Sequence, residues 1–121
     1  MKDYERCIIL PFDKNSLNFT EDEDLNYAYL EQTIKYINEL LKSDDCKGLY
    51  LNDLCEIFAI PIKHTYIEYG IRKGTKFDPR IKPGWVLIDE DKGEVWDYID
   101  LEFVVEPVIE RGLDFVKWLV K

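Results

Sequence analysis

Apolar residues recur along this chain with two different periods, one typical of helices and one typical of strands. Residues 6–12 form a short apolar run closed by Pro11, which predicts a buried strand. From about Thr20 to Lys42 the period becomes helical, which predicts a long helix. The side chains expected to form its core-facing stripe are Tyr27, Leu30, Ile34, Ile37 and Leu41.

Two further features of this helix are the residue at which it begins and a second stripe of apolar residues. Thr20 followed by Glu23 matches a capping box, so we expect the helix to begin there. Beside the core stripe lies a second stripe of Leu25, Tyr29, Tyr36 and Leu40. It is either a wider buried face or an aromatic ridge that faces a partner, and the pattern is compatible with both.

The middle of the chain predicts a short helix, a strand and a loop. Residues 64–71 alternate in polarity, as in a strand, and residues 72–84, with two prolines and two glycines, predict an irregular loop. Before them, Asn52 or Asp53 can cap a short helix that Pro61 prevents from continuing. Its apolar residues at helical spacing are Leu51, Leu54, Cys55 and Phe58.

Residues 84–99 predict a β-hairpin, which we expect to lie at the centre of the fold. An apolar run from Trp85 to Ile88 leads into a charged turn, where Gly93 supplies the positive φ that a short loop needs. The second strand can continue to Val105. Trp96 and Tyr98 share one side of it and Asp97 lies on the other, but the alternation does not tell which side faces the core.

The last segment predicts a helix with Pro107 in its first turn. Together the elements predict a single α+β domain over residues 1–121. We expect a small, mostly antiparallel sheet of three or four strands, with the long N-terminal helix and the C-terminal helix packed on it.

Composition and charge narrow the class of protein. The chain has 121 residues, is 46% hydrophobic and carries a formal net charge of −9. This sign argues against nucleic-acid binding, which needs a clustered positive surface. Three cysteines without a C-x-x-C pair suggest reduced thiols and a cytoplasmic protein. No apolar run approaches the roughly 20 residues of a membrane span, so no membrane partner is expected.

Catalytic patterns are sparse. His64 is the only histidine, which excludes sites built on two histidines, and no phosphate loop, dinucleotide fingerprint or zinc spacing occurs. No catalytic, cofactor-binding or metal-binding residue is therefore predicted. The enzyme alternative is a small enzyme that uses Cys55, with His64 as a base, or a carboxylate pair. Cys55 lies on the apolar stripe of its helix, which favours a core residue.

Charge is segregated along the chain. From Asp89 to Asp114 there are ten acidic residues against two basic ones, Lys92 and Arg111. The loop before them is basic and contains Arg72, Lys73, Lys76, Arg80 and Lys82. An acidic face with aromatic residues is typical of an inhibitor that docks on a basic protein. The predicted partner-binding residues are Asp89, Asp91, Glu94, Trp96, Asp97, Tyr98, Asp100 and Glu102.

Three short stretches resemble a known family. Ile88-Asp89, Gly93-Glu94-Val95-Trp96 and residues 113–119 are similar to the C-terminal part of bacterial toxin-immunity domains of the SUKH type. The resemblance covers about a third of the chain, within residues 84–121. It implies a functional class, the small acidic proteins that neutralise a cognate toxin, and it carries over neither a fold nor binding residues.

The leading hypothesis is thus an acidic, cytoplasmic module that neutralises a basic protein partner, such as a cognate nuclease toxin domain. Two alternatives remain besides the enzyme. One is an inhibitor from a phage or mobile element that mimics the charge of nucleic acid. The other is local anion binding by Arg72, Lys73 and Lys76 in the basic loop.

Overall fold

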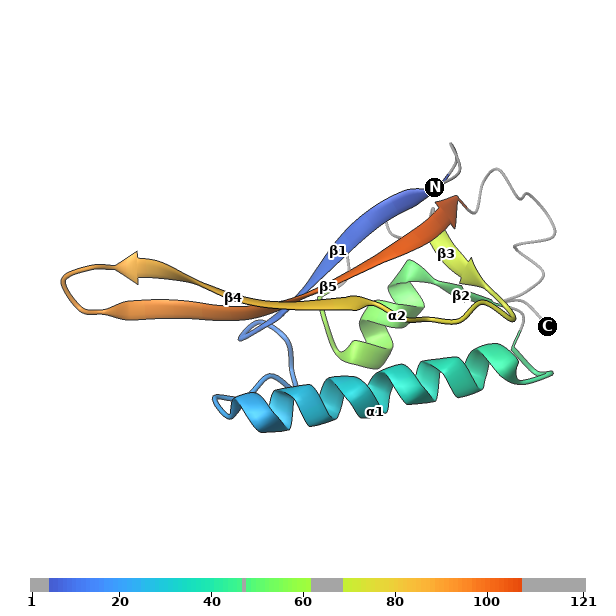
Figure 1. Ribbon diagram of the computed structural model, residues 1–121, viewed down its shortest axis with the longest axis horizontal. Coiled ribbons are helices and arrows are strands. Elements are labelled where there is room, and N and C mark those ends of the chain that lie inside the picture. The colour runs from blue at the N-terminus through green and yellow to red at the C-terminus, as the bar shows by residue number, and fades with distance from the viewer. Residues whose placement is uncertain (1–4, 47, 62–68, 108–121) are drawn as a thin grey trace.

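The computed structural model describes residues 5–46, 48–61 and 69–107. It is an α+β fold with a five-stranded antiparallel sheet and two helices (Figure 1). The elements in chain order are β1 (Arg6–Asp13), α1 (Glu23–Lys42), β2 (Gly48–Tyr50), α2 (Leu51–Phe58), β3 (Tyr69–Arg72), β4 (Arg80–Asp89) and β5 (Glu94–Pro107). The α+β class is confirmed. The sheet is larger than predicted, because the three residues of β2 are too few to show a period in the sequence.

β5 is the strand around which the sheet is built. Along one edge it pairs with β1, from Val105 opposite Arg6 to Tyr98 opposite Asp13. Along the other edge it pairs first with β4 and then, at residues 106–107, with β3. β2 pairs with β3 and completes the order β1-β5-β3-β2, with β4 beside β5.

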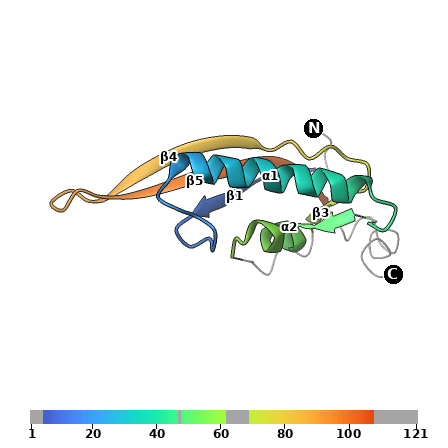
Figure 2. The ribbon, with the colours of Figure 1, turned by 90° about the horizontal axis from the view of Figure 1, so that it is seen from below.

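The core lies between one face of this sheet and the two helices. Figure 1 shows α1 below the sheet and α2 between β5 and α1, and Figure 2, seen from below, shows α1 in front of β4 and β5. Alternate residues of β5 point into this layer and are buried: Ile99, Leu101, Phe103 and Val105. The helices contribute buried side chains to the same cluster: Leu30, Ile37, Leu41, Leu51, Leu54, Cys55 and Phe58. The predicted apolar face of α2 is therefore confirmed in full.

The two apolar stripes of α1 are buried unequally. In the core stripe, Tyr27 and Ile34 are only partly buried and pack at the border of the cluster. In the second stripe, some side chains pack on the core and others are exposed. Tyr29 stacks on Phe12 at 5.5 Å between ring centroids, whereas Leu25 and Tyr36 are exposed.

The beginning of α1 differs from the prediction. Asp22, not Thr20, is the N-cap, and its carboxylate accepts a hydrogen bond from the Leu25 N–H at 3.2 Å. The Thr20 hydroxyl instead accepts a hydrogen bond from the Asp22 N–H at 3.1 Å, in the turn that precedes the helix. Asn26 ties this turn to the helix, because its amide group both donates to the Thr20 carbonyl and accepts from the Thr20 N–H.

The cap of α2 also differs, since Tyr50 is the N-cap rather than Asn52 or Asp53. Asp53 lies in the first turn, where its carboxylate accepts the Tyr50 N–H at 2.8 Å. Burial raises the pKa of this carboxyl, and the bond from Tyr50 opposes that rise. The helix ends at Phe58, after which Ala59 takes a left-handed conformation with a φ of 59°.

Two boundaries around the hairpin need correction. The predicted loop 72–84 is shorter, because β4 already begins at Arg80. A strand can include Pro83 because, in the described part of the chain, β4 pairs only with β5 and leaves its other edge free. Pro107 ends β5 instead of beginning a helix. The rest of the predicted C-terminal helix, and residues 64–68 of the predicted strand, lie outside the described residues.

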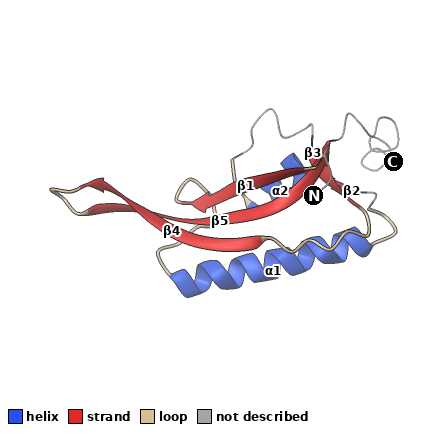
Figure 3. Ribbon diagram, turned by 45° about the horizontal axis from the view of Figure 1, so that its top comes forward, coloured by secondary structure: helices blue, strands red, loops and turns tan. Residues whose placement is uncertain are grey.

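The hairpin itself is confirmed. β4 and β5 pair from Arg80 opposite Glu102 to Asp89 opposite Glu94, and Gly93 in the turn has a φ of 66°. Its turn end extends well beyond α1 and β1, as Figures 1 and 3 show.

A matched pair of leucine substitutions tests where the core ends. Leu101 is fully buried, so Leu101→Ala should lower the free energy of unfolding by about 2–5 kcal/mol. Leu87 lies in the projecting part of the same hairpin and is 46% exposed, so Leu87→Ala should cost less than about 0.5 kcal/mol. Urea unfolding of both variants measures the difference, and a similar cost for both would place Leu87 in the core.

Candidate binding surface

The projecting part of the hairpin, residues 85–97, is a two-stranded ribbon, and we call it the hairpin end. β1 stops pairing with β5 at Asp13 opposite Tyr98, one residue before the hairpin end begins. From Trp85 opposite Asp97 to the turn, β4 and β5 pair only with each other within the described residues. Both outer edges of the ribbon therefore carry backbone groups with no third strand.

The hairpin end exposes a group of large apolar side chains. Trp85 is 64% exposed, Val86 51%, Leu87 46%, Ile88 51% and Val95 43%. The sequence pattern predicts residues 85–88 as an apolar strand of the hairpin, and they are not among the predicted partner-binding residues. The sequence did contain a signal, because four consecutive apolar residues put apolar groups on both faces of a strand. A strand with only one covered face would alternate.

The acidic residues of the hairpin end surround this apolar group. They are Asp89, Glu90, Asp91, Glu94 and Asp97, against the single basic residue Lys92. Asp89 has a structural role, since its Oδ1 accepts the N–H groups of Asp91 at 3.0 Å and Lys92 at 3.2 Å and so shapes the turn. Asp91, Glu94 and Asp97 are exposed.

Trp96 and Tyr98 lie on the outer face of the sheet, away from the helices, and each is partly buried. The Trp96 indole N–H donates to Oδ2 of Asp13 at 3.3 Å, and the ammonium group of Lys14 lies 4.1 Å from the centroid of the Trp96 ring. These contacts fix the base of the hairpin end to the loop after β1, so Trp96 also supports the hairpin.

Tyr98 crosses the strand opposite it. A Cβ atom added at Gly84 would lie 2.4 Å from Cζ of the Tyr98 ring, so only a glycine allows this close approach. The ring therefore packs on the backbone of β4 where the hairpin end begins.

The two remaining predicted acids, Asp100 and Glu102, lie at the base of the hairpin. Nζ of Lys82 is 2.9 Å from Oε2 of Glu102, and Nη1 of Arg80 is 3.8 Å from its Oε1. The hydrogen bond from Lys82 lowers the pKa of the Glu102 carboxyl. Partial burial raises the pKa of Asp100, a rise that Lys82 opposes and that Glu102 and Asp13 add to.

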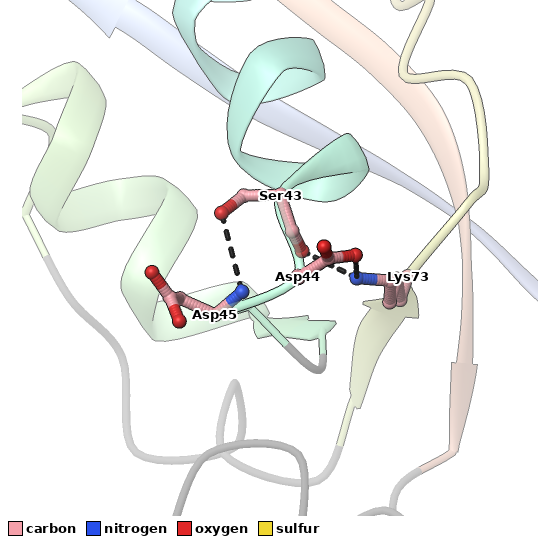
Figure 4. Close-up of polar contacts among 4 residues, drawn as sticks. All are labelled: Ser43, Asp44, Asp45 and Lys73. Atoms are coloured by element: carbon pink, nitrogen blue, oxygen red, sulfur yellow. Dashed lines mark hydrogen bonds and ion pairs between the residues drawn. The ribbon is translucent and has the colours of Figure 1, made fainter.

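The basic loop is largely neutralised by neighbouring carboxylates. Nε of Arg72 lies 3.0 Å from Oε1 of Glu106 in β5. Nζ of Lys73 lies 3.7 Å from the Asp44 carboxylate and also donates to the Ser43 carbonyl (Figure 4). This position suits a cation, because the C-terminal end of α1 carries partial negative charge. Two of the three residues of the anion-binding alternative are thus already paired.

The acidic stretch therefore divides in space into two groups with different surroundings. Acids at the base of the hairpin and at the end of β5 face the basic residues of the loop and of β4. Acids of the hairpin end form no ion pair with any of the described residues. Within the described residues, much of the negative charge without an ion pair is carried by the hairpin end, which also exposes the apolar side chains, and by residues 21–24 at the start of α1.

A cleft of about 680 Å³ extends this surface toward the helix. It lies between the segment that begins α1 and the base of the hairpin end. Its walls include Phe19, Glu21, Glu23, Trp85, Asp97 and Tyr98, and no lysine or arginine of the described residues lines it. The negative charge of the hairpin end thus continues into a concave surface beside α1.

Of the two residues considered for a nucleophile–base pair, the structure describes only one. Cys55 is fully buried in the core, and His64 lies outside the described residues. Among residues 5–46, 48–61 and 69–107, no three histidine, cysteine or acidic side chains are grouped as metal ligands. The helices in this part of the chain are all too short or too polar to cross a membrane.

Comparisons of the chain with protein-family models, with curated proteins and with solved structures found no match. The resemblance to immunity domains therefore stays a prediction.

The opposite pKa shifts of two acids in β5 predict opposite effects on stability. The raised pKa of Asp100 means that its ionisation disfavours folding, so Asp100→Asn should gain stability over the wild type as pH rises through that pKa. The lowered pKa of Glu102 means that its ionisation favours folding. Glu102→Gln should therefore be less stable at pH 7 and approach the wild type as pH falls through the pKa of Glu102.

Thermal unfolding of both variants and the wild type between pH 3 and pH 7 measures these differences. Each variant is the control for the other, because both remove one negative charge from the same strand. Effects of equal sign would show that net charge, rather than the local surroundings, decides stability.

Proposed function

We propose that this protein is a binding module that covers and neutralises a basic partner protein, as the immunity protein of a bacterial nuclease toxin does. The observation that carries the proposal is the composition of the hairpin end. It combines exposed Trp85 and its apolar neighbours with five carboxylates and one ammonium group. Large exposed apolar patches rimmed by polar residues are typical of protein interfaces, and tryptophan is among the residues that anchor them.

Charge selects the class of partner. An acidic surface accelerates association with a basic one and disfavours acidic or neutral competitors. Because Arg72, Arg80 and Lys82 neutralise acids at the base of the sheet, much of the negative charge without an ion pair in the described structure lies on the hairpin end and on residues 21–24, two of which line the cleft beside it. A basic partner would therefore be attracted to this side of the molecule.

A nuclease suits this surface for a chemical reason. An enzyme that binds a polyphosphate backbone needs lysine and arginine side chains along its substrate groove. An acidic protein that occupies such a groove competes directly with nucleic acid and so blocks the enzyme. The resemblance of Gly93-Glu94-Val95-Trp96 to immunity domains favours the same class.

The proposal is tested with paired charge variants. The protein serves as bait in an extract of its source cell, and the captured protein is identified, purified and titrated by calorimetry. Glu94→Gln with Asp97→Asn should weaken binding about tenfold at low salt, which corresponds to about 1.4 kcal/mol. The difference should shrink between about 0.05 M and about 0.5 M NaCl, because salt screens exposed charges.

The matched control is Glu31→Gln with Glu39→Gln, which removes the same charge from the exposed side of α1. It should change the affinity less than about twofold if the hairpin end provides the electrostatic contact. An assay of nucleic-acid cleavage by the purified partner, with and without this protein, tests neutralisation. Equal losses in both variants, or no inhibition of a basic partner, would contradict the proposal.

A further inference from the structure

We infer that the hairpin end binds by insertion into an apolar cleft of a basic partner, so that the partner covers both faces of the ribbon. The inference rests on the proposed function. It adds the shape of the surface that the partner must offer, a slot lined by apolar groups and basic at its rim and floor.

Both faces of the ribbon carry apolar side chains. Leu87 pairs with Val95, and Trp85 with Asp97, on the face continuous with the buried side chains of β5. Val86 pairs with Trp96 on the outer face. A flat partner surface could cover only one of these faces and would leave the other in water. Each face carries a residue more than 40% exposed, so covering both removes more apolar area from water.

Contacts within the chain hold the ribbon in place before it binds. An isolated two-stranded hairpin is marginally stable in water. Here the contact of Trp96 with Asp13 and Lys14, and the packing of Tyr98 on Gly84, fix the ribbon where it leaves the body. The bond network of Asp89 fixes its turn. A ribbon supported at both ends loses less conformational entropy on insertion.

Charge decides between a partner and a second copy of the chain. Five carboxylates and one ammonium group give the hairpin end a net charge of −4. Two hairpin ends that packed on one another would bring these like charges together in an environment of low dielectric. A cleft with basic residues avoids this repulsion. Because Asp89, Glu90 and Asp91 lie at the turn, they would enter first and meet the basic floor of the cleft.

The test substitutes one exposed apolar residue on each face and measures the affinity for the partner recovered above. Leu87→Ser changes the face continuous with the core, and Val86→Ser changes the outer face. If the ribbon inserts, each variant should weaken binding about tenfold or more, as expected for a buried interface residue. The matched control is Ile9→Ser, which changes a residue of β1 that is also half exposed but lies outside the hairpin end. It should leave the affinity within about twofold.

Loss of affinity in only one of the two face variants would overturn insertion and leave the proposed function intact, because the partner would still bind one side. Failure to find any basic partner would remove the proposed function and the inference with it. Circular dichroism and urea unfolding of each variant confirm that the change affects binding rather than folding.

A second measurement uses the chain alone. Sedimentation equilibrium should find a monomer across the accessible concentrations, because the charge of the hairpin end opposes its self-association. A dimer that Leu87→Ser dissociates, and that Ile9→Ser does not, would assign the hairpin end to a second copy and overturn the inference.

Discussion

The strand β5 is longer than the structure that covers it, and the rest of the molecule depends on this mismatch. Toward its C-terminal end, alternate side chains are buried against α1 and α2, and β1 pairs along its edge as far as Tyr98. Toward its N-terminal end the strand continues with β4 alone. One continuous hairpin therefore supplies the centre of the core at one end and an exposed apolar ribbon at the other. Burial of the first part holds the second part in position.

Electrostatics separate the same two parts. Lys82 and Arg80 lie beside Glu102 because β4 and β5 pair in a register that puts Arg80 opposite Glu102 and Lys82 opposite Asp100. Basic side chains thus pair with acids at the base of the hairpin, next to the rest of the fold. What remains at the hairpin end is mostly negative. This charge also opposes pairing of the exposed apolar ribbon, which has two free edges, with other chains.

The hairpin end is supported at its base and exposed along its faces. Its base is packed by Tyr98 on Gly84 and by Trp96 against Asp13 and Lys14, so its direction is fixed by the fold. Its faces carry side chains that fold into no part of the described core. Affinity would come from covering those side chains, and selectivity from the carboxylates around them.

Local signals in the sequence are sufficient to predict several of the elements. Helical periodicity was enough for α1 and for the buried face of α2, and Gly93 with the flanking apolar runs was enough for the hairpin. Of the candidate site, the sequence identified the acids of the turn and of β5. It could not tell which side of β5 Trp96 and Tyr98 occupy, because alternation defines two faces but does not say which one is covered.

Packing in the tertiary structure sets which apolar residues are core and which are surface. Val95 and Leu101 have the same parity in one strand, yet one is exposed and the other fully buried, because the helices and β1 end between them. It also decided that Glu102 is paired and that Asp97 is exposed, since ion pairs depend on strand register. Residues distant in sequence set both outcomes, and no local pattern contains that information.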